Sequence, residues 1–473
     1  MAKTLEDLPR EMFTSIGQFL PKDSLARLAR CSNHCYTSCI EYLYSHCTVR
    51  NRKMLKELIN TILNRPVIGP SIRWLDLRHF NLTDLYFIPP WKITSLDLYK
   101  KAVLVQNNLV SWDTPIWKRD CWMDISCWAL ITVLLCLVPE LKVLGLPDLE
   151  PDLRGNQEYF LGGDYYEVSA FSDFITQLTE DQHTESSDSA SLRVLTKLES
   201  ITIGLDFHPR RTQLNSIMPL MALKSVKRFK VVWMWHCSWM EMYRVKSFTP
   251  IPNIEVLKFD ECIFSDDIVT FLGRFTGIQR FCLSASPKAL DEMLNDESLF
   301  LDDVLEGLKS SKHSLEYVDV RSVPCSMDDQ PLSLSEFKRL QVAKFYPPPS
   351  IWSSGSFPEN ESRLSNSLPP GLRILAWELF HVIHDVINLK QLYELVAQKE
   401  KYTPELRQIE LLWSDCNPRY RCKDCKNNCE WNEKIPFYTE LIAECKAKNV
   451  RIFSNHTSWK GSGTPDPEDL ENN

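Results

Sequence analysis

One short apolar pattern recurs along most of this chain and constrains its fold more than any other feature. An apolar residue is followed by two variable residues, a second apolar residue, one variable residue and a third apolar residue. Where the spacing is tightest, the copies begin at Val226, Ile254 and Ile278, which are 28 and 24 residues apart. The copies are Ile72–Leu77, Ile93–Leu98, Leu141–Leu146, Leu198–Ile203, Val226–Val231, Ile254–Phe259, Ile278–Leu283, Leu315–Val320, Leu340–Phe345, Leu372–Trp377 and Leu406–Leu411.

The last two apolar positions of each copy are two residues apart, so they share one face of a strand. Between the copies lie segments with helical spacing of their apolar residues, at Asp124–Leu137, Asp267–Phe275 and Ser298–Leu308. A strand followed by a helix, repeated many times, predicts an α/β fold in which parallel strands stack into a curved solenoid. An ordinary α/β domain is the alternative, because a short apolar pattern also recurs by chance.

The first fifty residues predict three short helices instead of a repeat. Pro21 ends the first helix, Asp23 or Ser24 can cap the second, and Ser32 or Asn33 can cap the third. Apolar residues fall at helical spacing in each of them: Leu8, Met12, Ile16, Phe19 and Leu20, then Leu25, Leu28 and Cys31, then Tyr36, Ile40, Leu43 and Tyr44. A module this small buries little apolar surface, so we expect it to have a partner.

The run from Leu8 to Ser32 resembles an F-box, and the Leu43-Tyr44 pair is typical of the fungal kind. Two positions depart from the family pattern: Cys31 stands where valine is usual, and Cys35 where an aromatic residue is usual. The alternative is a plain three-helix cap on the following domain. The resemblance implies that the module docks on a Skp-type adaptor through Leu8, Pro9, Met12, Ile16, Leu20, Leu25 and Leu28.

The repeats resemble the degenerate leucine-rich repeats that follow the box in fungal F-box proteins. Regular leucine-rich repeats carry a ladder of asparagines, which is missing here; Asp260-Glu261-Cys262 comes closest. The expected fold is therefore a small three-helix F-box followed by an irregular leucine-rich-repeat solenoid. The expected boundaries are an F-box at 1–50, a helical linker at 51–70, the repeat domain at 71–456 and a disordered acidic tail at 457–473.

The resemblance implies a substrate-recognition subunit of an SCF (Skp–cullin–F-box) ubiquitin ligase, which is not itself an enzyme. Its partners would be the Skp-type adaptor, through it a cullin and a RING subunit, and a target protein held for ubiquitination. The alternative is an interaction scaffold that binds the adaptor without cullin. A third hypothesis is an enzyme whose catalytic residues are distant in the sequence.

Composition narrows the compartment and the partners. A net charge of −8 argues against general nucleic-acid binding and against anionic membranes. The N-terminus lacks the apolar core of a signal peptide, and the longest uncharged run, Ile125–Pro139, is too short to span a bilayer. The 16 cysteines are scattered, so we expect reduced thiols and a cytoplasmic or nuclear protein.

The sequence contains neither a Gly-x-Ser-x-Gly elbow nor a His-Glu-x-x-His motif, and no cofactor is expected. His381 and His384 lie three residues apart, which is more typical of a helix surface than of a metal site. The weak zinc candidates are Cys416, Cys422, Cys425 and Cys429, of which two form a Cys-x-x-Cys pair. Reduced thiols in a loop are the favoured interpretation of these four.

The candidate substrate site is a stripe of cations on the strand face that points away from the apolar core. Arg228, Lys230, Lys258 and Arg280 flank the inward positions of three successive copies. Neighbouring strands stand about 5 Å apart, so these side chains would act together on an acidic or phosphorylated segment. The alternative is a solvated face that nearby carboxylates neutralise. The clustered tryptophans, at 112–128 and 233–239, are expected in the core.

Overall fold

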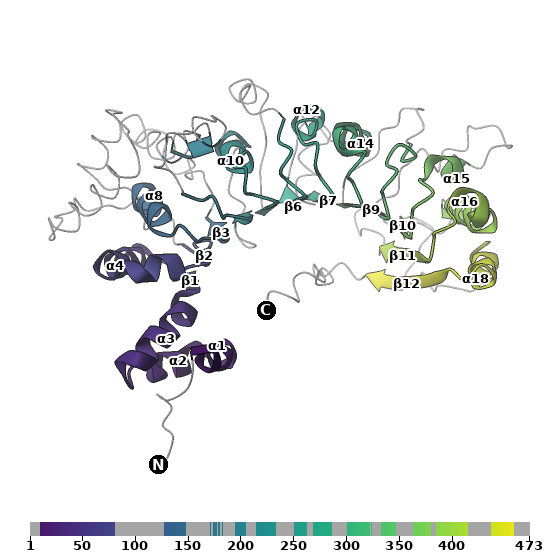
Figure 1. Ribbon diagram of the computed structural model, residues 1–473. Helices are drawn as coiled ribbons and strands as arrows, with labels where there is room; N and C mark the ends of the chain where they lie inside the picture. Colours follow the sequence, from purple (N-terminus) through teal and green to yellow (C-terminus); the bar gives the residue numbers. More distant parts are fainter. Residues whose placement is uncertain are drawn as a thin grey trace, which may run out of the picture. The chain divides into compact units, whose positions relative to one another are not determined.

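The computed structural model describes most of the chain outside its long insertions. The described residues are 10–80, 127–147, 171, 174–176, 178–179, 182, 194–204, 214–232, 250–262, 268–285, 300–321, 323, 333–346, 363–379, 385–414 and 437–457. The chain divides into two compact units, Met1–Ile263 and Phe264–Asn473, and each is described by itself (Figure 1).

The first unit begins with three helices and continues with parallel strands. Its strands pair in the order β1-β2-β3-β4-β5-β6, and every pair is parallel. Its elements are α1 (Arg10–Phe19), α2 (Lys22–Leu28), α3 (Asn33–Tyr44), β1 (His46–Thr48), α4 (Arg52–Asn64), η2 (Pro66–Ser71), β2 (Trp74–Asp76), α8 (Cys127–Leu137), β3 (Val143–Leu146), β4 (Ser200–Ile203), α10 (Leu214–Met221), β5 (Arg228–Val232) and β6 (Val256–Cys262).

The second unit repeats the same strand arrangement, in the order β7-β8-β9-β10-β11-β12, again with parallel pairs throughout. Its elements are α12 (Ile268–Leu272), β7 (Arg280–Ala285), α14 (Leu301–Leu308), η4 (Lys309–Ser311), β8 (Tyr317–Arg321), β9 (Val342–Tyr346), α15 (Arg363–Ser367), β10 (Ile374–Leu379), α16 (Asp385–Ala397), α17 (Lys399–Tyr402), β11 (Gln408–Ser414), α18 (Tyr438–Ala447) and β12 (Arg451–Thr457).

The expectation of an α/β fold with stacked parallel strands is confirmed. Ten of the eleven apolar patterns coincide with β2 to β11, and the copy at Ile93–Leu98 lies outside the described residues. The helices predicted before β3, β7 and β8 are α8, α12 and α14. Two strands, β1 and β12, were not predicted. The first lies in a weak copy of the apolar pattern, Tyr44-x-x-Cys47-x-Val49, whose first residue was assigned to the preceding helix. The second begins at a shortened pattern, Val450-Arg451-Ile452.

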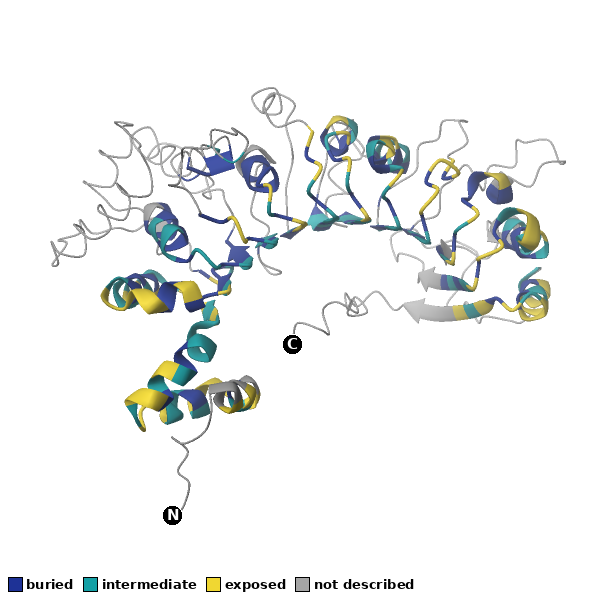
Figure 2. Cartoon of the chain, in the orientation of Figure 1, coloured by how far each residue is buried: buried dark blue, intermediate teal, exposed yellow. Residues whose placement is uncertain are grey.

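Each unit has its core between the strands and the helices, which lie on one face of the strands (Figures 1 and 2). The three apolar positions of each described copy are buried, as in Leu141, Leu144 and Leu146 before and within β3. The intervening strand positions point to the other face, where no described helix lies. Trp128 and Trp377 are buried, as expected for core tryptophans; the tryptophans at 112–122 and 233–239 lie outside the described residues.

A backbone ladder joins each repeat to the next just before the strand. The carbonyl of Lys142 accepts hydrogen bonds from the N–H groups of Glu199 and Ser200, at 2.8 and 3.0 Å. The carbonyl of Glu199 does the same for Lys227 and Arg228, at 2.9 and 3.0 Å. In the second unit Gln279, Glu316, Gln341 and Arg373 occupy the equivalent place. Buried backbone groups at the strand entrances are thereby satisfied.

Polar side chains stabilise the turns at the same place. Asn253 donates through Nδ2 to the carbonyls of Leu223 and Val226, at 2.8 and 2.7 Å. Ser225 donates to the carbonyl of Leu195, and Ser314 to that of Ile278, both at 2.9 Å. Each of these three residues directly precedes the first apolar position of its repeat. The asparagine of regular repeats is absent, and the side chains that bridge repeats here come before the strand.

Replacing Asn253 by alanine should destabilise the protein measurably. The change removes the side-chain donor of the Val226 carbonyl, while the Leu223 carbonyl keeps the N–H of Val226. An unsatisfied buried carbonyl costs about 1–3 kcal/mol. Asn253→Asp should be at least as harmful, because a carboxylate would face the same carbonyls. Denaturant midpoints measure the effect. The control is Glu255→Ala, which removes only an exposed ion pair with Lys227 and should cost less than about 1 kcal/mol. Equal losses for Asn253→Ala and Glu255→Ala would contradict the role given to Asn253.

Candidate functional site

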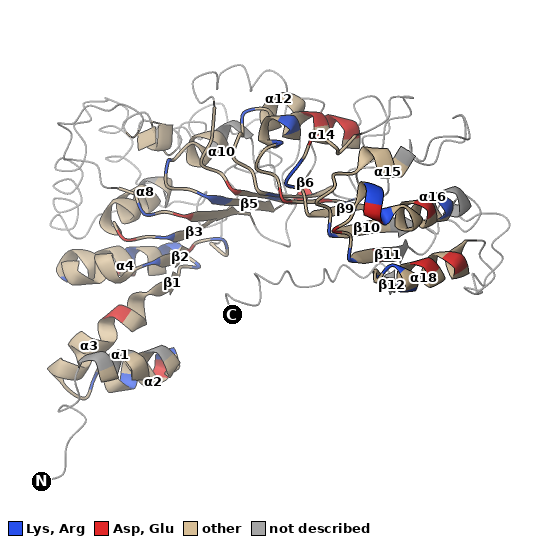
Figure 3. Cartoon of the chain, turned by 45° about the vertical axis from the view of Figure 1, so that its right-hand side comes forward, with Lys and Arg blue, Asp and Glu red and all other residues tan. Residues whose placement is uncertain are grey.

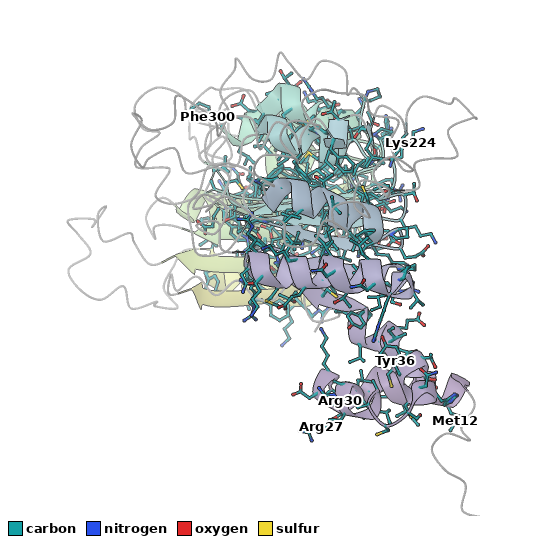
Figure 4. The ribbon with its side chains drawn as sticks, turned by 90° about the vertical axis from the view of Figure 1, so that its left-hand side faces the viewer. Met12, Arg27, Arg30, Tyr36, Lys224 and Phe300 are labelled. Atoms are coloured by element: carbon teal, nitrogen blue, oxygen red, sulfur yellow. The ribbon has the colours of Figure 1, made fainter. Side chains whose placement is uncertain are left out.

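The first candidate site is an exposed apolar face on α1. Met12 is 50% exposed and Phe19 is 86% exposed. These residues are seven apart, almost two full turns, so their side chains leave the same face of the helix. Met12 projects outward from the three helices, as do Arg27 and Arg30 on and after α2 (Figure 4). Two large apolar side chains in water on one helix face mark a surface suited to a protein partner.

The residues predicted to contact an adaptor divide into three groups. Leu8 and Pro9 lie outside the described residues. Met12 is exposed, while Ile16, Leu20 and Leu28 are half-buried. Leu25 is buried and packs inside the module, so it positions α2 and offers no contact surface of its own. Phe19, which was not among the predicted contacts, is the most exposed large apolar side chain described; its spacing from Met12 is the signal that identifies it.

The core of the module comes mainly from α3. Cys35, Cys39 and Ile40 are buried, so Cys35 is a small core residue of the module. Burial raises the pKa of the Cys39 thiol, with the neighbouring thiols adding to the effect, and such a thiol is inert at neutral pH. Ser32 caps the helix, its side chain accepting from the N–H of Cys35 at 3.1 Å.

Specific contacts attach the three helices to the first repeats. Lys22 donates from Nζ to the carbonyl of His46 in β1, at 2.6 Å. Arg65, directly after α4, donates to the hydroxyl of Tyr36 at 2.5 Å, and its guanidinium lies 5.2 Å from the centre of that ring. The Ser45 carbonyl at the end of α3 accepts from the N–H groups of Arg73 and Trp74. The backbone ladder therefore starts on the module itself.

The second candidate site is the predicted stripe of cations. Arg228 is exposed, and Lys230 lies in register with Lys258 on the neighbouring strand. However, Lys230 forms an ion pair of 2.7 Å with Asp260, and positive and negative positions are interleaved on the strands (Figure 3). Arg280 belongs to the other unit, where it lies 4.3 Å from the centre of the Tyr317 ring. Three of the four cations are thus brought together, beside one carboxylate.

A five-residue motif occurs twice on this face and pairs an aspartate with an arginine in each copy. Trp74-Leu75-Asp76-Leu77-Arg78 and Tyr317-Val318-Asp319-Val320-Arg321 share the order aromatic, apolar, aspartate, apolar, arginine. In each, the arginine returns to the aspartate two residues before it with two hydrogen bonds, at 3.0 and 3.0 Å for Arg78 and at 2.9 and 2.8 Å for Arg321. These charges neutralise each other and are less available to a ligand.

In each pair the charged partner shifts the pKa of the other group. Burial tends to raise the pKa of Asp76, but the hydrogen bonds and charge of Arg78 outweigh burial and hold that pKa below its usual range. Hydrogen bonding to Asp319 is the main cause that raises the pKa of Arg321. A third pair, Lys344 with Glu410 at 2.9 Å, passes over Ala376 of the strand between them. Pairing is therefore the rule for the buried charges on this face.

A shallow hollow of about 400 Å³ in the first unit is lined by charged side chains before β2, β3 and β4, but Lys197 and Glu140 pair there at 2.7 Å and Lys142 and Glu199 at 3.6 Å. No cluster of three metal-ligating side chains occurs in the described part of the chain. The candidates Cys416, Cys422, Cys425, Cys429, His381 and His384 all lie outside it.

Within the described ranges, no helix combines the length and the apolar content needed to cross a bilayer.

Gly145 provides room for the Asp76–Arg78 pair, and replacing it should be costly. Gly145 is in register with Asp76 on the next strand, and a β-carbon there would lie 2.7 Å from Asp76 Oδ1 and 3.0 Å from Arg78 Cγ. We expect Gly145→Ala to lower the free energy of unfolding by about 1–3 kcal/mol. In an Asp76→Ala/Arg78→Ala background the same change should cost little, as measured by a double-mutant cycle. A cost that is equal in both backgrounds would show that the strain arises elsewhere.

Comparison with known proteins does not place the chain: no protein-family model and no curated protein matches it.

Proposed function

We propose that this chain is the substrate-recognition subunit of an SCF ubiquitin ligase. The three-helix module, residues 10–44, docks on a Skp-type adaptor, and the repeats hold a target protein. The chain carries no catalytic step; it brings the target within reach of the cullin-bound enzyme that transfers ubiquitin.

The observation that carries this proposal is the exposed apolar face of α1. The sequence of α1 and α2 resembles an F-box, and Met12 is one of the positions where the resemblance expects partner contacts. Phe19, which the resemblance does not single out, is exposed on the same face of α1. A few large side chains that become buried against a partner usually contribute most of the binding free energy of a protein interface. The anchored attachment of the module, through Lys22 and Arg65, favours a receptor in which a bound target keeps a defined place relative to the adaptor.

The face of the strands without helices is the part of the fold that supports the second half of the proposal. Its side chains are held at spacings that the strand register fixes, which suits recognition of an extended segment. In the first unit the strands β5 and β6 present Arg228, Lys230 and Lys258 on this face, with the carboxylate of Asp260 beside Lys230. Charge on this part of the face therefore favours an acidic or phosphorylated segment of the target.

Replacing both exposed apolar side chains of α1 should abolish adaptor binding. Met12→Asp/Phe19→Asp places charge on the proposed interface, and each anchor is expected to be worth about 2 kcal/mol or more. The measurement is the dissociation constant of the purified chain for a Skp-type adaptor, with circular dichroism as the test of folding. The matched control is Met54→Asp/Val67→Asp, which charges two exposed apolar side chains on α4 and η2 and should leave adaptor affinity unchanged.

Two results, the second from a pull-down of the same chains, would contradict the proposal. Undiminished adaptor binding by the α1 variant would exclude the module as an F-box. Binding of the adaptor without recovery of cullin and a RING subunit would favour the scaffold that uses the adaptor alone. Recovery of all three with the wild-type chain, and of none with the α1 variant, is the expected result.

Reversing two cations of the first unit should reduce target capture while adaptor binding persists. Arg228→Glu/Lys258→Glu reverses one exposed and one half-buried cation, on β5 and β6 respectively. Proximity labelling of wild-type and variant chains, with proteasome activity blocked, measures capture, and adaptor recovery is the internal standard. The matched control is Lys224→Glu, an exposed lysine that precedes β5 and does not belong to the strand face (Figure 4). An unaltered set of labelled proteins would place recognition elsewhere on the chain.

A further inference from the structure

The strand β12 ends its sheet with one edge open. It pairs with β11 along its whole length, from Arg451 beside Gln408 to Thr457 beside Ser414. In the part of the chain that the structure describes, no strand pairs with its other side (Figure 1). The seven residues of β12 contain no proline and follow the register of β11 without a bulge. Proline and β-bulges are two devices by which proteins protect an edge strand. Because β12 has neither, its backbone can pair with another strand on that side.

The backbone groups on the open edge can be identified. The N–H of Arg451 donates to the carbonyl of Arg407, at 2.8 Å, so Arg451 directs its backbone groups toward β11. Because these groups alternate along a strand, Phe453, Asn455 and Thr457 also face β11. Ile452, Ser454 and His456 therefore present their N–H and carbonyl groups to the open side.

Apolar side chains are exposed at the same end of the second unit. Phe453 is 44% exposed on β12, and Ile442 is 40% exposed on α18. Among the described residues of this unit they are the only large apolar side chains so exposed; the helices of preceding repeats bury theirs, as α14 does with Leu301, Val304, Leu305 and Leu308. A terminal repeat lacks the neighbour that would cover its apolar surface.

We propose that β12 is a dimerisation strand that pairs antiparallel with β12 of a second copy of this chain. With Ser454 at the two-fold axis, Ile452 lies opposite His456 of the second copy, and Ser454 opposite Ser454. These are the residues whose backbone groups face the open edge, so each opposed pair exchanges two hydrogen bonds. A single edge then serves both copies, as a two-fold interface requires.

The side chains of this register fit self-pairing. Phe453 lies opposite Asn455 of the second copy, and the two Phe453 rings become diagonal neighbours on one face, within reach of each other. Arg451 is the only charged residue from 451 to 457 and falls opposite Thr457. In this register no charged residue lies opposite another charged residue. Pairing of two identical strands therefore brings no like charges together, which would destabilise it.

Sedimentation or light scattering of the full chain across concentration tests this proposal. An interface of one strand pair is small, so we expect the mass to rise from monomer to dimer over about 1–100 µM. Ser454→Pro removes an N–H on the open edge and spares the β11 pairing, since edge strands accept proline there. This variant should remain monomeric at every concentration, with unchanged thermal unfolding. Ser454→Ala keeps the N–H and should dimerise like the wild-type chain.

Three outcomes would overturn the proposal. A wild-type chain that stays monomeric throughout the range shows that β12 does not self-pair. Dimerisation that survives Ser454→Pro assigns the interface to another surface. A monomer that becomes a dimer only after removal of residues 458–473 shows that the chain's own C-terminal segment occupies the edge in the intact protein. Adaptor binding is measured separately in all variants and should not change.

Discussion

The rest of the structure depends on one backbone arrangement, in which a carbonyl at the entrance of a strand accepts two N–H groups from the following repeat. In the first unit these carbonyls belong to Ser45, Arg73, Lys142, Glu199 and Lys227. Because each of these carbonyls fixes the entrance of the strand that follows, that strand starts in register with its neighbour, whatever the length of the intervening segment. Long insertions are then tolerated, since closing a longer loop adds little entropic cost.

The same arrangement determines what the molecule can offer to partners. Strand register places every second side chain on the face without helices, where two aromatic-x-Asp-x-Arg motifs pair their aspartate and arginine with each other. What this face can bind therefore depends on where the accessible charges such as Arg228 lie, more than on how many charges the face carries. At the N-terminal end, the first double acceptor is Ser45, which directly follows α3. The three helices are thus attached to the repeats by the same hydrogen bonds that join the repeats to one another.

The sequence predicts the repeated part of the fold well, because three apolar positions at fixed spacing are a strong local signal. Leu141, Leu144 and Leu146 are all fully buried as that spacing requires. The strands β1 and β12 were missed because their local signals are weak. β1 lies at Tyr44-x-x-Cys47-x-Val49, where tyrosine and cysteine stand in place of the usual aliphatic residues, and β12 follows a truncated pattern.

The candidate sites were less predictable because charge partners come from neighbouring repeats. Lys230 is a cation by sequence, but Asp260 lies beside it only because β5 and β6 pair in a particular register. By contrast, Tyr317, Asp319 and Arg321 alternate along one strand, so their shared face was visible in the sequence. Phe19 was also identifiable, since it lies seven residues after Met12 on an expected helix. Contacts within one strand or helix could be predicted from the sequence, whereas contacts between neighbouring strands depend on the strand register and could not.

Hydrogen–deuterium exchange of the full chain with and without a Skp-type adaptor tests the central claim most directly, because it reports on every described element at once. The account predicts that the adaptor protects amides in α1 and α2, residues 10–28, and leaves the exchange of β3 to β12 unchanged. Protection within the strands, or an α1 whose exchange the adaptor does not alter, would contradict the division of the chain into a docking module and a target-binding repeat domain.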